Sequence, residues 1–145
     1  PHFKIPPTLV LNPSDEMKLM QEEIFGPVLP IKSYEKVEDS VEYINTKDRP
    51  LGLYYFGDDK KEQEYLLKNT TSGGVTVNDV ISHVTMETLP FGGVGPSGMG
   101  SYHGYDGFKE FSHAKSIYKQ TKFNLNKIAG LVPPYKSKTN KVSAS

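Results

Sequence analysis

The sequence predicts an α/β fold, because short apolar runs with strand character alternate with segments that carry helical patterns. Three such runs, at residues 26–34, 51–57 and 74–78, combine aliphatic, β-branched and aromatic residues, which is typical of strands. The segments between them are short. We therefore expect parallel strands joined by right-handed crossovers.

A further strand is expected before this alternation begins. TLVLN, at residues 8–12, is a short apolar run that is closed by an Asn-Pro pair, a common turn signal. Residues 13–24 are polar and charged. GPVLPIKSY, at residues 26–34, contains Pro27 and Pro30, and proline cannot donate a hydrogen bond to a neighbouring strand. This strand is therefore expected at a sheet edge or a bulge.

A helix is predicted after residue 34. Val37, Val41 and Ile44 are spaced i, i+4 and i+7, so they form one apolar stripe on a helix. Acidic residues follow Val37 in the first turn, where they favour the helix dipole. Pro50 prevents the helix from continuing.

A second helix is predicted between the strands at residues 51–57 and 74–78. Asp58 or Asp59 can cap its N-terminus, and the helical pattern extends to about Asn69. Tyr65 and Leu66 are expected to face inward.

The chain beyond residue 83 is predicted to be mainly loop. A short helix is expected at residues 107–111, and SIYKQ, at residues 116–120, is expected to form one more strand. Residues 136–145 are polar and form the end of a basic tail.

Composition excludes several classes of site. The 145 residues include no cysteine, which excludes disulfides, cysteine-ligated zinc and a cysteine nucleophile within this chain, and no metal site is predicted. No apolar run is long enough to span a membrane. The net charge is zero, but residues 111–145 hold seven lysines and no acidic residue. These lysines are spread singly without arginine, so nucleic-acid binding is not favoured over a solvated arm that docks on an acidic body or on a neighbouring subunit.

The stretch LPFGGVGPSGMG, at residues 89–100, matches the dinucleotide fingerprint G-x-G-x-x-G at Gly93, Gly95 and Gly98. That fingerprint follows a buried strand and opens a helix. Neither neighbour is expected here, because METLPF precedes the glycines and further glycines follow them. We interpret the stretch as an irregular loop whose glycines permit positive φ or close backbone approach.

The predicted strands form an incomplete sheet, and the chain begins at Pro1 without a methionine. Open sheet edges are a liability for pairing and aggregation. We therefore expect the sequence to be a fragment whose sheet is completed by a segment outside it.

EEIFGPVLPI (22–31) and LPFGGVGPSGMG (89–100) together resemble the aldehyde dehydrogenase superfamily. The Val37–Ile44 helix, RPLGLYYFG, SGGVTVND and FSHAKSIYKQ fit in register, so the resemblance covers about residues 7–120. MQEEIFGPVLPI, His83 after NDVIS, and GMGSYHGYDGF are similar to the class 3 branch, and the tail KIAGLVPPY is similar to bacterial coniferyl aldehyde dehydrogenases.

The resemblance implies a three-layer α/β/α catalytic domain with mostly parallel strands. Residues 1–115 would be the C-terminal part of that domain, and residues 116–145 an interface strand with a polar, basic tail. It also implies a cytoplasmic homodimer or other homo-oligomer.

The resemblance implies NAD- or NADP-dependent oxidation of an aldehyde, of aromatic, coniferyl type, to a carboxylate. In that chemistry a cysteine thiolate attacks the carbonyl, hydride passes to the nicotinamide, and a glutamate activates water. This chain has no cysteine and no segment that resembles the nucleotide-binding half or the general-base motif. No catalytic residue is assigned, and the isolated chain is expected to be inactive.

Five residues are assigned roles by the resemblance. Glu23 would accept hydrogen bonds from the nicotinamide ribose, and Phe25 would lie against the nicotinamide ring. Phe91, His83 and Asn78 would border the aldehyde tunnel. The alternatives are a solvated surface acid for Glu23, a core aromatic for Phe25, a loop anchor packed in the core for Phe91, and a hydrogen-bonded structural histidine for His83.

Two other functions remain open from the residues themselves. The chain could be a non-catalytic interaction or oligomerisation module that uses its basic tail. It could also hold a nucleotide through the glycine loop. A cysteine-bearing segment upstream in the same chain would favour the enzyme.

Overall fold

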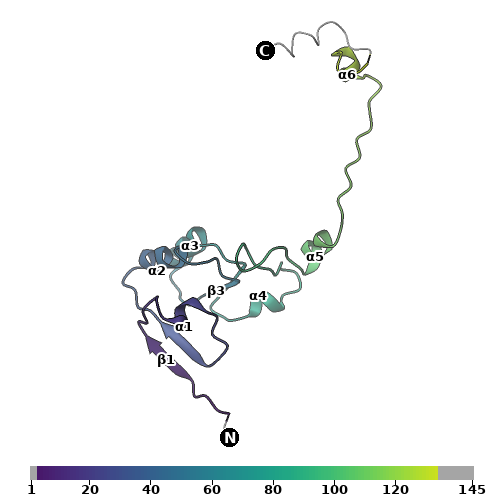
Figure 1. The fold of residues 1–145 in the computed structure, drawn as a ribbon. Coiled ribbons are helices and arrows are strands. Elements are labelled where there is room, and N and C mark those ends of the chain that lie inside the picture. The colour runs from purple at the N-terminus through teal and green to yellow at the C-terminus, as the bar shows by residue number, and fades with distance from the viewer. Residues whose placement is uncertain (1–2, 134–145) are drawn as a thin grey trace. The chain divides into compact units, whose positions relative to one another are not determined.

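The computed structural model describes residues 3–133 (Figure 1). Contacts divide the chain into two compact units, Pro1–Phe111 and Ser112–Ser145, and each is described by itself. The polar segment 136–145 lies outside the described residues. The predicted domain division, with its boundary after residue 115, stays a prediction.

The first two strands are confirmed and pair in parallel. β1 (Thr8–Leu11) and β2 (Val28–Ile31) align with Leu9 opposite Leu29. The short helix α1 (Lys18–Gln21) lies between them. It was not predicted, because one turn of helix is too short to show apolar periodicity.

The second half of the alternation forms a βαβ unit, as predicted. Helix α2 (Val37–Asn45) leads to β3 (Gly52–Tyr55), and α3 (Lys60–Asn69) connects it to the parallel strand β4 (Gly74–Val77). Asp59 caps α3, because its carboxylate accepts hydrogen bonds from the backbone N–H groups of Lys61 and Glu62 at 2.8 and 3.2 Å. The sequence prediction of this cap and of both helices is confirmed.

A small apolar core holds this βαβ unit together. Val41 of α2, Tyr55 of β3 and Leu66 of α3 are buried. Partly buried side chains pack against them: Val37, Leu53 and Val77. Burial raises the pKa of the Tyr55 hydroxyl above its ordinary value.

The prediction that Tyr65 faces inward with Leu66 is wrong, because Tyr65 is 37 % exposed. Adjacent helical residues point about 100° apart, and the core that buries Leu66 does not include Tyr65.

The strands do not form one sheet. β1 pairs with β2 and β3 with β4, so the described residues hold two separate two-stranded sheets, and the predicted sheet of 26–34, 51–57 and 74–78 is wrong in its pairing. An apolar run identifies a strand but not its partner, because pairing depends on distant segments.

A polar cluster links the β1–β2 pair to α2. The carboxylate of Asp15 forms ion pairs with Lys32 Nζ at 2.6 Å and Lys47 Nζ at 3.1 Å, and it accepts a hydrogen bond from the Tyr43 hydroxyl at 2.7 Å. Hydrogen bonding to Lys32 is the main cause that holds the pKa of Asp15 well below its usual range. The same interaction raises the pKa of Lys32.

The remaining helices are short. They are α4 (Ser82–Thr85), α5 (Gly104–Glu110) and α6 (Leu125–Ile128). The longest helix of the described part, α3, has ten residues, so none of the described helices can cross a bilayer.

Helix α5 begins earlier than the predicted residues 107–111, and it contains two glycines, Gly104 and Gly107. Gly104 is the first residue and has φ +50°. A Cβ at Gly107 would lie 3.3 Å from the Cα atom of Tyr102, so the glycine permits close packing of the helix on the preceding chain.

The predicted strand at 116–120 is absent, because the structure assigns no strand to these residues. A strand is defined by the hydrogen bonds of its partner, and no described residue pairs with this segment. Pairing of 116–120 with a second subunit stays a prediction.

Candidate functional site

A constrained turn after β4 positions His83. Asn78 and Ile81 both have positive φ, of 55° and 64°. For a β-branched residue such as Ile81 this conformation costs on the order of 1–3 kcal/mol. Asp79 holds the turn, because its carboxylate accepts hydrogen bonds from Val80 N–H at 2.8 Å and from the Ser82 hydroxyl. The bond from Ser82 is the main cause that lowers the pKa of Asp79.

The turn places His83 on the two glycines that begin β3 and β4. Gly52 and Gly74 are paired across the strands, and a Cβ at Gly74 would lie 2.9 Å from His83 Nε2. The His83 side chain is buried, with 7 % exposure, and Thr76 Oγ1 lies 2.6 Å from its Nδ1 atom. Any larger residue at Gly74 would displace the imidazole.

His83 is part of an aromatic cluster that includes Phe91. The ring centroids of His83 and Phe91 are 6.1 Å apart. Phe91 stacks on His103 at 6.3 Å with an interplanar angle of 28°, and Tyr102 meets it edge-on at 5.6 Å. Tyr54 approaches His83 from β3 at 5.9 Å. The cluster therefore joins the βαβ unit to the glycine-rich loop.

The glycine-rich loop is fixed by backbone pairing rather than shaped as a phosphate cradle. Phe91 and Tyr102 exchange two backbone hydrogen bonds of 2.9 Å, so the loop between them is closed at its base. Gly95 and Gly98 have positive φ, as predicted. The next helix, α5, begins only at Gly104, and it is not opened by the fingerprint glycines. The interpretation as an irregular loop is confirmed.

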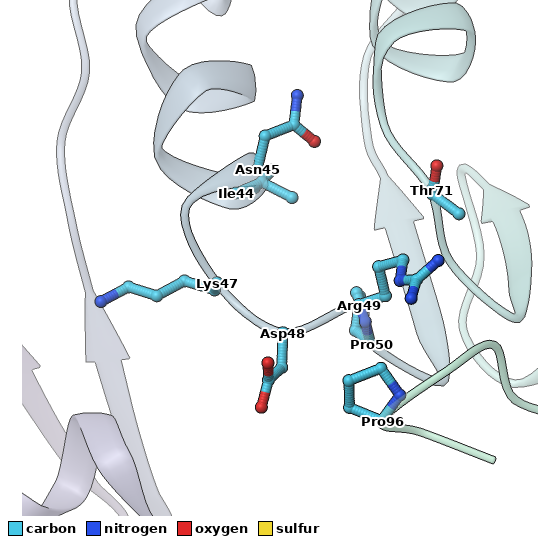
Figure 2. A pocket seen from close by; sticks show the side chains of 8 residues that line it. All are labelled: Ile44, Asn45, Lys47, Asp48, Arg49, Pro50, Thr71 and Pro96. Atoms are coloured by element: carbon cyan, nitrogen blue, oxygen red, sulfur yellow. The ribbon is translucent and has the colours of Figure 1, made fainter.

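Two cavities border this loop. One, of about 490 Å³, is lined by Phe91, Gly92, Gly93, the segment 97–102 and three residues outside the loop, Leu51, Glu110 and Phe111. Figure 2 shows the other, of about 470 Å³, between the end of α2 and Pro96 of the loop. Arg49 lines this second cavity, and its guanidinium lies against Gly95. None of the five predicted site residues lines the second cavity.

Asn78 is engaged by the backbone of the neighbouring strand end. Its amide accepts a hydrogen bond from Gly57 N–H at 2.8 Å and donates one to the Gly57 carbonyl at 3.1 Å. Asn78 therefore clamps the end of β4 to the end of β3. This contact uses both polar atoms of the side chain.

Glu23 and Phe25 lie in the connection from α1 to β2, and both are exposed. Phe25 is 91 % exposed, and the described residues give the Glu23 carboxylate no hydrogen bond or ion pair. Both side chains are therefore available to a ligand. Among the described residues, no ring contact joins Phe25 to the cluster around His83.

Of the five predicted residues, the structure brings His83 and Phe91 together. The sequence interpretation assigned no role to Thr76, Tyr102 and His103, which complete their surroundings. Thr76 could have been found from strand alternation, because it lies between two valines of GVTV and so faces the side opposite to theirs. Tyr102 and His103 carry no such signal.

Comparisons with known proteins give one family. The sequence pattern of the aldehyde dehydrogenase family matches residues 2–117. A probable coniferyl aldehyde dehydrogenase of Caulobacter vibrioides is 63 % identical over 134 residues, which are 92 % of this chain and 28 % of that protein. The coniferyl aldehyde dehydrogenase of Pseudomonas sp. strain HR199 is 55 % identical over 130 residues, 90 % of this chain and 27 % of that protein.

A dimeric, NADP-preferring aldehyde dehydrogenase of Rattus norvegicus is 44 % identical over 134 residues, 92 % of this chain and 30 % of that protein. The substrate-bound AldH of Staphylococcus aureus is similar in structure, with a TM-score of 0.73 and 38 % identity over 97 % of this chain and 30 % of that one. A betaine aldehyde dehydrogenase of the same organism, in complex with NAD⁺, has a TM-score of 0.65 and 28 % identity over 72 % of this chain and 21 % of that one. The chain thus spans less than a third of the relatives it matches.

Proposed function

Because this chain belongs to the aldehyde dehydrogenase family, we propose that it supplies the C-terminal part of the catalytic domain of an NAD(P)-dependent aldehyde dehydrogenase. The proposed substrate is an aromatic, coniferyl-type aldehyde, which is oxidised to a carboxylate. The observation that carries the proposal is the sequence identity of 54–63 % with relatives named for that aldehyde. The parallel strands and the closed loop around Phe91 support it.

Glu23 and Phe25 are proposed to hold the nicotinamide end of the cofactor. An exposed carboxylate without a partner suits two vicinal ribose hydroxyls, because an ionised carboxylate only accepts hydrogen bonds. The exposed Phe25 ring offers an apolar face to a flat ligand. When bound, the cofactor would accept the hydride, and these residues would only bind and orient it.

His83, Phe91 and Asn78 are proposed to form one wall of the aldehyde site. The ring of Phe91 is held on several sides by other aromatic rings, so it would present a fixed apolar surface to an aromatic aldehyde. Asn78 would act here through the backbone of Gly57.

The nucleophile must come from outside this sequence, because the chain has no cysteine. We expect the isolated chain to reduce no NAD⁺ or NADP⁺ with benzaldehyde or cinnamaldehyde. Turnover above a heat-killed control would contradict both this expectation and the thiol mechanism.

The proposal is tested by a chimera. This chain replaces the matching segment of the Pseudomonas sp. strain HR199 enzyme, which covers 27 % of that protein. We expect the chimera to oxidise coniferyl aldehyde, and the same enzyme with the segment deleted to be inactive. A folded but inactive chimera would contradict the proposed function.

We also propose that residues 116–120 pair with a second subunit to form a homodimer. The segment has exposed apolar side chains, with Ile117 72 % and Tyr118 83 % exposed, and a related enzyme is named as dimeric. Ile117→Lys in the chimera should shift its sedimentation toward the monomer. An unchanged dimer would refute the role of this segment.

A further inference from the structure

We propose that Thr76 is a positioning residue for the aldehyde site: its hydroxyl fixes the ring of His83, and that ring supports Phe91. The inference rests on the proposed function, because it gives Thr76 a role only if Phe91 borders the substrate. Neither the motifs nor the family resemblance assigns any role to this threonine.

The surroundings of Thr76 indicate whether its hydroxyl or the His83 Nδ1 atom is the hydrogen-bond donor. Thr76 and His83 are both buried, with 8 % and 7 % exposure. Thr76 Oγ1 accepts a hydrogen bond from the backbone N–H of His83 at 3.3 Å and lies 2.6 Å from the His83 Nδ1 atom. If Nδ1 donated, the buried hydroxyl hydrogen would have no acceptor among the described residues. Thr76 therefore donates to Nδ1, which leaves the ring hydrogen on Nε2.

This bond is the main polar constraint on the orientation of the imidazole. His83 Nε2 is buried and has no hydrogen-bond partner among residues 3–133. The ring packs on Gly52 and Gly74, which make van der Waals contact but do not distinguish its nitrogen and carbon edges. Without the Thr76 hydroxyl, no side-chain hydrogen bond among the described residues would hold the rotation of the ring about its Cβ–Cγ bond.

The His83 ring supports one side of the Phe91 ring. The Phe91 ring is flanked by His83 at 6.1 Å and by His103 at 6.3 Å. His103 follows the same glycine-rich loop as Phe91. His83, in contrast, lies in α4, which follows strand β4 of the βαβ unit. Loss of a fixed His83 ring would leave Phe91 free to move on that side.

The matched pair Thr76→Val and Thr76→Ser separates the hydroxyl from the shape of the side chain. Valine keeps the shape and removes the donor, whereas serine keeps the donor. In the chimera we expect Thr76→Val to raise KM for cinnamaldehyde about five- to tenfold, the usual effect of one lost hydrogen bond. KM for the smaller propanal should change less than about twofold. Thr76→Ser should restore the cinnamaldehyde value.

A double-mutant cycle tests whether Thr76 acts through Phe91. Phe91→Leu should itself raise KM for cinnamaldehyde, and Thr76→Val should add little in that background. If the two substitutions raise KM independently, so that their factors multiply in the double variant, the proposal that Thr76 acts through Phe91 is refuted. Thermal unfolding of each variant identifies a general loss of folding, which would lower the apparent kcat for both aldehydes. An equal rise in KM for both aldehydes would overturn the proposal.

The outcomes distinguish this inference from the proposed function. An inactive parent chimera refutes the proposed function and, with it, the functional role of Thr76. An active parent in which Thr76→Val and Thr76→Ser behave alike refutes the inference alone. The ¹⁵N spectrum of the His83 ring gives a readout without activity: Thr76→Val should alter the Nδ1 signal, and Thr76→Ser should preserve it.

Discussion

The two parallel strand pairs have the same length and pairing but different surroundings. The β3–β4 pair is covered by α2 and α3, which lie side by side, and its apolar residues reach a core of Val41, Tyr55 and Leu66 (Figure 1). The β1–β2 pair exposes Leu9 by 65 % and Leu29 by 57 %. The β3–β4 pair is therefore covered within the described chain, and we call it, together with α2, α3 and the elements from α4 to α5, the covered region. One face of the β1–β2 pair has no cover among the described residues, and we call this pair and the segment between its strands the bare region.

The same contrast separates the proposed site residues. His83 and Phe91 belong to the covered region and are held by rings on several sides. Glu23 and Phe25 belong to the bare region and touch little. Parallel sheets are usually buried on both faces. Under the proposed function, this exposed pair is where we expect the cofactor and the rest of the enzyme to contact this chain.

The largest expected effect tests the difference in cover. Leu66→Ala should lower the free energy of unfolding by about 2–5 kcal/mol, because it leaves a cavity in the core. Leu29→Ala should cost less than about 1 kcal/mol, because the side chain is largely exposed. Urea unfolding followed by circular dichroism measures both. Equal losses would mean that the β1–β2 face is covered after all.

The second prediction concerns the cofactor residues of the bare region. In the chimera, Glu23→Gln should weaken cofactor binding and hydride transfer by about 1–2 kcal/mol, because the neutral amide is a weaker acceptor. Glu22→Gln is the control and should change little. Steady-state and single-turnover kinetics measure both variants. If Glu22→Gln impairs hydride transfer and Glu23→Gln does not, the assignment of the EEIFGP motif is wrong by one residue.

The third prediction is that the isolated chain self-associates through the exposed leucines of the β1–β2 pair, Leu9 and Leu29. Leu29→Lys should weaken association about fivefold, because it removes one apolar side chain from the contact. Leu67→Lys on α3 is a matched control, since Leu67 is also partly exposed but lies on the covered region. Sedimentation velocity measures both. A tightly monomeric chain at high concentration would contradict the prediction.

The smallest effect is expected from the polar link between the two regions. The folded-state pKa of Asp15 is lowered, so its stabilising contribution is present above the ordinary aspartate pKa of about 4 and is lost as the pH falls below it. Asp15→Asn should therefore show a smaller loss of stability between pH 5 and pH 3, a window set by that ordinary pKa, than the unaltered chain. Asp48→Asn, at a residue for which the structure shows no ion pair, is the control. Identical pH profiles of stability for Asp15→Asn, Asp48→Asn and the unaltered chain would exclude a stabilising role of the Asp15 cluster.

The sequence by itself determined the local elements and the family motifs. The Val37, Val41 and Ile44 stripe and the Asp59 cap predict α2 and α3 because both depend on residues within one or two turns. The glycine loop was recognised as irregular because the neighbours required by a nucleotide fingerprint are missing from the sequence around it.

Only the tertiary structure decided which elements meet. The pairing of β1 with β2 and the inward turn of Leu66 instead of Tyr65 depend on residues distant in sequence. The glycines inside α5 depend on close contacts with the chain before the helix, at Tyr102 and Glu87. The contact of Thr76 with His83 likewise depends on a turn with positive φ at Ile81, a conformation that no propensity of isoleucine predicts. Local preferences select the elements, whereas packing selects their partners, because packing energy comes from contacts that the chain makes only after it has folded.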